Sequence, residues 1–344
     1  MSAETLPPPS PVEEPLAGRT DSRPPLPSGD RSGWGRLFAP TAVVAAALLV
    51  EWGLPHRQAV PPTRLYSGLL VGLLACTLVF AIVGAMRTRF SPWVRRNAPL
   101  VGGVAFLLAL WNIVTVKGNL LPLPYFPGPQ RVLLSLYDDR TMLAVSTYHS
   151  LRLLLAGYTA GVAAGLVCGI LIGWFRTIRY WGMPLLKVVG PIPATAYVPL
   201  MMVLFPNHFL SGAALIALAV WFPVTMLTAS GLANVPIAFL DVARTLGAGP
   251  RYLIFRVALP AALPSIFLGL FMGLGAAFLT LIVAETVGVS AGLGWYLKWQ
   301  QGYLEYANVY AALVIMSVFF SGLMTLLFLV RDRVLNWQKG VIRW

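Results

Sequence analysis

Charged, thiol and imidazole side chains are scarce in this sequence. Of its 344 residues, 11% are charged, and only 12 are acidic, three are histidine and two are cysteine. Cys76 and Cys168 both lie within apolar runs, where a thiol usually acts as a small hydrophobic group. No spacing typical of a disulfide framework, a zinc site or a Ser-His-Asp set is present. The sequence therefore predicts neither a metal centre nor a hydrolase site.

The sequence also lacks a phosphate-binding loop of the form GxxxxGK[ST]. Such a loop surrounds nucleotide phosphates with backbone N–H groups, so its absence removes the most recognisable type of ATP site. No apolar run follows a basic region near Met1, so we do not expect a cleavable signal peptide. We expect a non-catalytic chain, and any ATP chemistry connected with it belongs to another chain.

Apolar residues are abundant instead. They make up 58% of the chain, and the mean hydropathy of +0.75 exceeds that of ordinary globular domains. Eight stretches meet or approach the length of about 20 apolar residues that crosses a bilayer. These are Leu37–Leu54, Leu65–Ala85, Pro99–Val116, Leu151–Trp174, Pro184–Phe205, Phe209–Ala229, Leu263–Val287 and Val309–Val330. We therefore predict an all-α polytopic membrane protein with about eight transmembrane helices.

The positive charge is distributed unevenly along the chain. The net charge is +13, and Lys and Arg gather in the cytoplasmic loops of membrane proteins. The segments after the second, fourth, sixth and eighth stretches are strongly basic, which predicts that both termini are cytoplasmic. Residues 1–36 are proline-rich and poor in large apolar side chains, so we expect a disordered cytoplasmic tail.

A polar segment, Asp241–Pro264, separates the sixth and seventh stretches and has a helical pattern of its own. The apolar face has Phe239, Val242, Ala243 and Leu246, and the polar face has Asp241, Arg244 and Thr245. Gly247 and Pro250 break this helix, and a second short helix is predicted to begin at Arg251 and to stop before Pro260. The pattern indicates a helix-turn-helix at the membrane boundary, and an ordinary amphipathic loop is the alternative.

The fifth stretch contains four prolines, which interrupt the hydrogen bonds of a helix. A membrane tolerates such a helix where neighbours or cavity water satisfy the freed carbonyls, and broken helices often line transport sites. We therefore predict a translocation path built from this helix and its neighbours. The predicted path residues are Pro193, Thr195, Tyr197, Thr225, Thr228, Thr280 and Glu285. A single threonine more often bonds within its own helix or joins two helices, so the prediction concerns the set.

Few ionisable residues lie within the stretches. Glu51 is at the end of the first, and Arg152 and Lys187 lie near predicted helix ends, where they can reach the membrane interface. Glu285 lies deeper, and a carboxylate there normally faces a bundle interior or a water-filled cavity. A structural hydrogen-bond acceptor at the outer end of its helix is an equally supported alternative.

The polar segment matches a family motif in spacing. Asp241-Val242-Ala243, three residues, Gly247, nine residues and Val257-Ala258-Leu259-Pro260 resemble the EAA loop of ABC-importer membrane subunits, E-A-A-x3-G-x9-I-x-L-P. The departures are Asp for Glu, Val for Ala and Val for Ile. Further similarity to the nitrate/sulfonate/taurine branch of these permeases lies in Phe126–Val132, Gly190–Leu200, Ala243–Leu270 and Val283–Leu297.

This resemblance covers about Leu121 to Trp344 and implies a domain organisation. A six-helix importer-permease core, residues 98–344, follows two additional transmembrane helices in residues 37–97, and the coupling loop spans residues 235–262. The first two helices and the segment LFPNHFLSG after the fifth stretch depart from the family pattern.

The resemblance also implies partners. The loop would dock on a separate ATP-binding-cassette subunit, present in two copies, which binds ATP and Mg, so this chain itself needs no cofactor. The residues implied in coupling are Asp241, Val242, Ala243, Arg244, Leu246, Gly247, Leu259 and Pro260. The resemblance further implies a second permease copy, so that we expect a homodimer, together with an extracytoplasmic solute-binding protein. The assembly would lie among the lipids of a bacterial inner membrane and would bind no nucleic acid.

The implied cargo is a small anion or zwitterion, because relatives of this branch carry nitrate, bicarbonate, alkylsulfonates and taurine. An ion-coupled secondary transporter is one alternative, and it requires coupled ionisable residues in mid-span, of which only Glu285 qualifies. A non-transporting membrane scaffold is another, but it does not explain the spaced Gly and Leu-Pro positions.

Overall fold

The computed structural model describes residues 33–61, 64–86, 91–287 and 291–338. All regular elements in these ranges are helical, which confirms the predicted all-α fold. Residues 1–32 of the predicted tail lie outside the described ranges.

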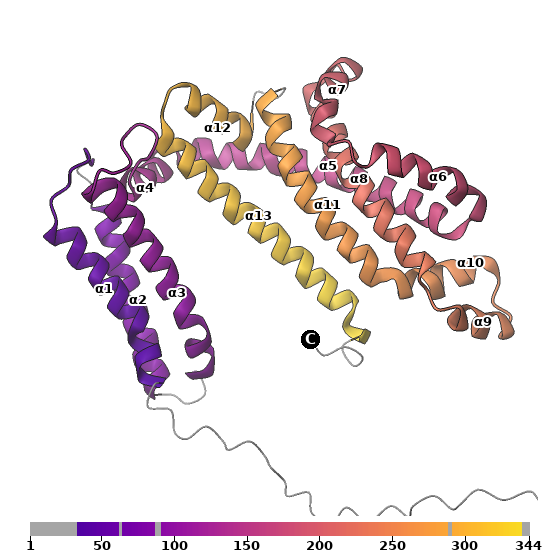
Figure 1. The fold of residues 1–344 in the computed structure, drawn as a ribbon, viewed down its shortest axis with the longest axis horizontal. Coiled ribbons are helices and arrows are strands. Elements are labelled where there is room, and N and C mark those ends of the chain that lie inside the picture. Colours follow the sequence, from indigo (N-terminus) through magenta and orange to yellow (C-terminus); the bar gives the residue numbers. More distant parts are fainter. Residues whose placement is uncertain (1–32, 62–63, 87–90, 288–290, 339–344) are drawn as a thin grey trace, which may run out of the picture. The chain divides into compact units, whose positions relative to one another are not determined.

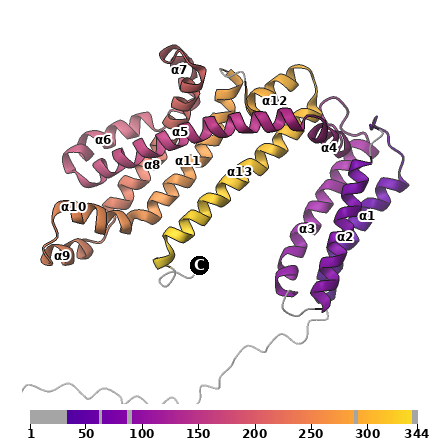
Figure 2. The ribbon, with the colours of Figure 1, turned by 180° about the vertical axis from the view of Figure 1, so that it is seen from behind.

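The chain divides into two compact units. The first contains most of α1 (Gly33–Gly53) and α2 (Leu65–Met86), together with α3 (Ser91–Asn112) as far as Leu107. Figures 1 and 2 both show these three helices side by side. The second unit contains residues Val50–Leu69 and Leu108–Trp344. The predicted division between residues 97 and 98 remains a prediction.

The second unit contains the remaining helices. In chain order they are η1 (Ile113–Lys117), α4 (Pro129–Asp138), α5 (Arg140–Trp174), α6 (Arg176–Val189), η2 (Ala194–Tyr197), α7 (Val198–Leu204), α8 (His208–Ala233), α9 (Ile237–Thr245), α10 (Pro250–Tyr252), η3 (Leu253–Ala258), α11 (Leu259–Val287), α12 (Leu293–Gly302), α13 (Tyr306–Val334) and η4 (Asn336–Gln338).

Six helices in the described ranges are long and apolar enough to cross a membrane. They are Leu65–Val83, Asn97–Lys117, Arg140–Trp174, His208–Ala233, Pro250–Val287 and Tyr306–Val334, and each overlaps one predicted stretch. The fifth predicted stretch is a pair of helices, Arg176–Val189 and Ala194–Leu204, bent by 84°. The first predicted stretch corresponds to a shorter apolar helix, Phe38–Gly53.

Helices α5, α8 and α11 form the core of the second unit. Leu153 and Leu154 of α5 pack with Ile216 and Val220 of α8 and with Leu281 of α11 in one buried cluster. Branched and small side chains on all three helices pack closely at their shared interface, and this van der Waals contact stabilises the bundle in a membrane.

The contact between α5 and α8 depends on a row of glycines that face α8. These are Gly157, Gly161, Gly165, Gly169 and Gly173, and a Cβ atom on each would lie 2.5 to 2.9 Å from an atom of α8. Contacts that short do not occur between real side chains, so only glycine lets the two backbones approach this closely. The pair therefore forms a closely packed element.

Helices α8 and α11 both connect to the polar segment at one end. Figures 1 and 2 show α9 and α10 at this end and α12 at the opposite end of α11. Gly247, at φ +83°, makes the turn after α9, a conformation that favours glycine. The predicted turn at Gly247 is therefore confirmed.

The predicted stop before Pro260 is wrong, because the helix continues from α10 through η3 into α11 as Pro250–Val287. Residues Leu253–Ala258 form a π-helical turn, and the Leu259 N–H bonds to the Ile254 carbonyl, five residues back. The wider turn changes the hydrogen-bond pattern just before Pro260. A proline that lacks an N–H and crowds the preceding turn is accommodated there without ending the helix.

A buried polar cluster joins the end of α1 to η1 and α4 within the second unit. The Lys117 ammonium donates to the carbonyl oxygens of Glu51 and Leu54, at 2.7 Å each, and lies 3.5 Å from the Glu51 carboxylate. Asn112 donates to that carboxylate at 2.8 Å, and Gln130 donates to the Asn112 side-chain oxygen at 2.9 Å. The charges are thus paired and hydrogen-bonded, as buried charges require.

Candidate functional site

The break between α6 and η2 positions the first wall of a pocket. Pro191 and Pro193 lack the N–H groups that would continue α6 across the break. At Gly190, a Cβ atom would lie 2.0 Å from the Phe222 ring, so only glycine fits against α8. These residues turn the chain so that η2 contacts α8 and α11. The predicted interruption of the fifth stretch is therefore confirmed.

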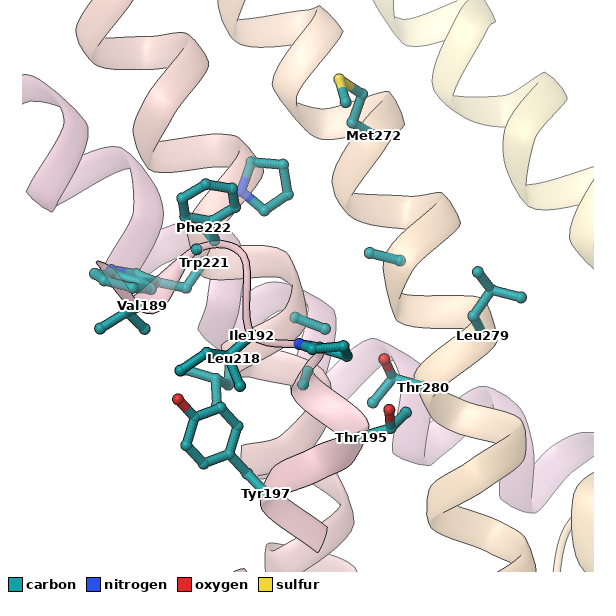
Figure 3. A pocket seen from close by; sticks show the side chains of 16 residues that line it. Val189, Ile192, Thr195, Tyr197, Leu218, Trp221, Phe222, Met272, Leu279 and Thr280 are labelled. Atoms are coloured by element: carbon teal, nitrogen blue, oxygen red, sulfur yellow. The ribbon is translucent and has the colours of Figure 1, made fainter. Parts of the chain in front are cut away.

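The pocket has a volume of about 390 Å³ and opens between the break, α8 and α11. The break and η2 contribute Val189, Gly190, Ile192, Pro193, Ala194, Thr195 and Tyr197; α8 contributes Leu218, Ala219, Trp221, Phe222 and Pro223; and α11 contributes Met272, Ala276, Leu279 and Thr280. Figure 3 shows the labelled side chains around it. All of these side chains are uncharged at neutral pH, and most are apolar.

Four of the seven predicted path residues line this pocket: Pro193, Thr195, Tyr197 and Thr280. Thr195 and Thr280 come from two facing elements, η2 and α11 (Figure 3). Helical periodicity along the separate stretches could not show that these residues share one cavity, because the break decides which side chains turn toward α11.

Thr225 and Thr228 are fully buried on the face of α8 that packs against α5. A Cβ atom on Gly169 would lie 2.5 Å from the Thr228 Cβ and 2.9 Å from the Thr225 carbonyl oxygen. Neither hydroxyl has a hydrogen-bond partner within the described residues. The structure therefore places both threonines in the helix contact and outside the pocket lining.

Glu285 is also separate from the pocket lining and is only 1% exposed. Its carboxylate accepts hydrogen bonds from the Ser150 hydroxyl at 2.6 Å and from the Gly294 N–H at 2.7 Å. The Ser150 oxygen accepts a further bond from the Leu293 N–H at 2.8 Å. Of the two alternatives for Glu285, this geometry matches the structural acceptor, which joins α11, α5 and the start of α12.

Gly292 belongs to the same cluster. Its φ is +125°, and a Cβ atom there would lie 2.3 Å from a Glu285 carboxylate oxygen. We call Ser150, Glu285, Gly292, Leu293 and Gly294 the carboxylate cluster. Sequence reasoning missed Ser150 and the glycine row of α5, although five glycines spaced four residues apart are a signal of close helix packing.

The polar segment at the opposite end of α8 and α11 has a different surface. Val242 is 61% exposed and Leu246 is 83% exposed, and Ile237 and Phe239 are also exposed. Ala243 is buried within the segment itself. Apolar side chains exposed together in this way are typical of a binding surface.

The other predicted coupling residues lie on α9 and at the start of α11. Asp241 and Arg244 form an exposed ion pair one helical turn apart, with 2.8 Å between Oδ1 and a guanidinium nitrogen. Leu259 and Pro260 are half-buried at the start of α11. The predicted coupling set thus forms one continuous segment whose exposed part is α9 and its turn.

Comparisons with known proteins identify the family. Residues 161–338 match the model of the binding-protein-dependent transport system inner membrane component. The chain is 33% identical over 213 residues to a probable ABC transporter permease protein of Haemophilus influenzae, covering 62% of this chain and 86% of the relative. It is 31% identical over 235 residues to the taurine transport system permease protein TauC of Escherichia coli, covering 66% of this chain and 85% of the relative.

A solved structure supports the fold. The chain aligns with a structure described as an inward-facing conformation of the MetNI methionine ABC transporter, at 18% identity and a TM-score of 0.50. The alignment covers 60% of this chain and 99% of that one. The chain belongs to the family of binding-protein-dependent transport system inner membrane components, as an ABC-importer permease of the nitrate/sulfonate/taurine branch.

Proposed function

We propose that this permease forms the translocation path of an ATP-driven importer and couples that path to a separate ATPase through residues 235–262. One observation carries the proposal: α8 and α11 provide two walls of the pocket, and both connect directly to the segment with the exposed apolar surface. A force applied to that segment therefore reaches both walls along continuous helices.

The exposed surface of α9 and its turn supports a docking role. Val242 and Leu246 would pack in a groove of the ATPase, and Asp241 and Arg244 would make polar contacts at its edge. Gly247 at positive φ fixes the direction of the chain after α9. Ala243, which is buried within the segment, supports α9 from inside.

The proposed importer contains the permease, its ATPase and a binding protein. Two ATPase subunits bind ATP and Mg and close on two permease copies, a homodimer, while this chain itself holds no cofactor and performs no covalent chemistry. An extracytoplasmic binding protein delivers the cargo. The basic loops support cytoplasmic termini and a cytoplasmic docking segment.

The proposed cargo is a small anionic or zwitterionic nutrient of the sulfonate, nitrate or taurine class. The similarity to a taurine permease supports this class. The hydroxyls of Thr195, Tyr197 and Thr280 are suitable donors for an oxyanion, and the pocket lining holds no carboxylate that would repel one.

An ion-coupled secondary transporter is less well supported. Its candidate coupling residue, Glu285, accepts two hydrogen bonds in a buried cluster and does not line the pocket. A scaffold without transport activity leaves the pocket and the exposed docking surface unexplained.

Docking and transport are tested together. The chain is purified with its ATPase and then reconstituted with the binding protein, and complex formation and ATP-driven uptake are measured. Gly247→Asp and Asp241→Lys are each expected to weaken the complex and to lower uptake more than 10-fold, because they disturb the turn and the edge of the docking surface. Tyr137→Ala, at a 59% exposed position on α4, is the control and should change neither. Unchanged docking and uptake in both loop variants would show that this segment does not couple the ATPase.

A further inference from the structure

We propose that the cargo is an organic anion or zwitterion with a substantial non-polar body, and that Trp221, Phe222 and Met272 select for that body. This inference rests on the proposed function and narrows it, because nitrate and bicarbonate have no such body. It assigns part of the substrate selection to the permease itself.

The lining of the pocket separates these two cargo types. Its side chains carry no charge at neutral pH, and its polar groups are few: the hydroxyls of Thr195, Tyr197 and Thr280 and the indole N–H of Trp221. A small inorganic oxyanion is polar over its whole surface, so in this pocket it would lose most of its hydration without gaining an opposite charge. An organic ion needs polar partners only at its head group, while its body gains from contact with apolar walls.

The volume of the pocket leads to the same conclusion. Cavities of about 300–1,000 Å³ typically hold molecules of drug size, and this pocket measures about 390 Å³. An ion of four or five heavy atoms would leave most of it unfilled, and the apolar walls would lose dispersion contacts. A sulfonate with a ring or a chain of several carbons fills more of the space.

The two sides of the pocket differ in chemistry. Thr195 and Thr280 lie on facing elements (Figure 3), and neither hydroxyl has a hydrogen-bond partner in the part of the chain that the structure describes. Both O–H groups are therefore available to donate to a sulfonate or carboxylate oxygen.

The aromatic side is formed by neighbouring residues of α8. The backbone of the break presses on the Phe222 ring, since a Cβ atom on Gly190 would lie 2.0 Å from it, so the ring position is fixed. Trp221 provides a second large ring, and Met272 on α11 is flexible enough to adapt to bodies of different shape. The fixed Phe222 ring and the adaptable Met272 side chain can together contact a flat or branched non-polar group of the cargo.

Uptake by the complete importer tests the inference. The permease, its ATPase and its binding protein are reconstituted in liposomes, and ATP-driven uptake of labelled nitrate, bicarbonate, methanesulfonate and benzenesulfonate is measured. We expect the fastest uptake for benzenesulfonate, slower uptake for methanesulfonate, whose non-polar body is a single methyl group, and uptake of nitrate and bicarbonate at least 10-fold slower than that of benzenesulfonate. Uptake of nitrate or bicarbonate that is as fast as uptake of benzenesulfonate would overturn this inference and leave the proposed function intact. Absence of ATP-driven uptake for all four probes contradicts the proposed function itself.

A pocket variant separates the permease from the binding protein, because the same binding protein serves all variants. Ala276→Phe narrows the pocket and is expected to slow benzenesulfonate uptake at least 10-fold, with a change of less than 3-fold for methanesulfonate. Ala219→Leu narrows it from α8 and should act in the same direction. Leu268→Phe, at a 52% exposed position of α11 outside the lining, is the control. Equal effects of Ala276→Phe and Ala219→Leu on both sulfonates would show that the pocket does not select by the cargo's body.

Discussion

The two ends of α8 and α11 are built in opposite ways. At one end, the Glu285 carboxylate accepts hydrogen bonds from α5 and from the start of α12, and its polar groups are satisfied inside the chain. At the other end, α9 leaves Val242 and Leu246 exposed, with apolar surface that the described residues do not cover. The difference is consistent with the proposal that one end is stabilised within the chain while the other binds a partner. Variants at the two ends should therefore fail in different assays.

Removal of the Glu285 carboxylate should have the largest effect on stability. Glu285→Ala leaves buried donors of Ser150 and Gly294 without their acceptor, and each unsatisfied group costs about 1–3 kcal/mol. We expect a loss of about 3 kcal/mol, or a fall in Tm of roughly 6–12 °C, measured by thermal unfolding in detergent. Glu285→Gln keeps one acceptor oxygen and should lose less. An Ala variant with normal Tm and abolished uptake would instead place Glu285 in the transport path.

Substitution in the glycine row of α5 should loosen the packing of α5 against α8. In Gly161→Leu, the new side chain would begin 2.6 Å from the Ala217 carbonyl oxygen, so α5 and α8 must separate. Such overpacking costs about 1–3 kcal/mol, visible as a lower Tm. Gly275→Leu on α11 is the matched control, because a Cβ atom there meets nothing within 4 Å. Equal Tm values for the two variants would show that close packing of α5 and α8 is not needed.

A polar substitution in the exposed apolar surface of α9 and its turn should leave stability unchanged and reduce transport. Leu246→Ser exchanges an 83% exposed side chain, so the free energy of unfolding should change by less than about 0.5 kcal/mol. Uptake should fall several-fold, because the proposed apolar contact with the ATPase would be lost. Leu120→Ser, at a 74% exposed position outside the segment, is the control. If Leu246→Ser instead lowers Tm as Glu285→Ala does, the contrast between the two ends is wrong.

The smallest effect is expected for the two buried threonines of α8. Thr225→Val and Thr228→Val keep the side-chain shape and remove hydroxyls that lack partners, so stability should be equal or higher by at most about 1 kcal/mol. Uptake should stay within 2-fold of the unmodified protein. The double variant Thr195→Val with Tyr197→Ala, which alters the pocket lining, should lower uptake in the same assay. A loss of uptake in the α8 variants alone would return Thr225 and Thr228 to the path.

Features that depend on local chain chemistry could be predicted from the sequence. The proline-bearing break, the turn at Gly247 and six of the apolar helices follow from backbone preferences and hydrophobic length. The predicted stop before Pro260 was wrong because a π-helical turn, which has no simple sequence signal, precedes the proline and allows the helix to continue.

Features that depend on which helix faces are in contact could not be predicted. Ser150 and Glu285 are 135 positions apart, and only the packing of α5 on α11 brings them together. The same holds for Thr225 and Thr280, which were predicted to share one path. The backbone of Thr225 lies against Gly169 of α5, whereas Thr280 lines the pocket.

The buried cluster around Lys117 limits how this protein can be shortened. A chain that begins at residue 98 retains the Lys117 ammonium and Asn112 but has lost the Glu51 carboxylate and the carbonyls of Glu51 and Leu54. An ammonium group left in that place without its acceptors would be a buried and unpaired charge, so the surrounding structure would have to open to water. Any truncated version made for biochemistry must therefore begin before Glu51, even though the similarity to the importer family starts far downstream of it.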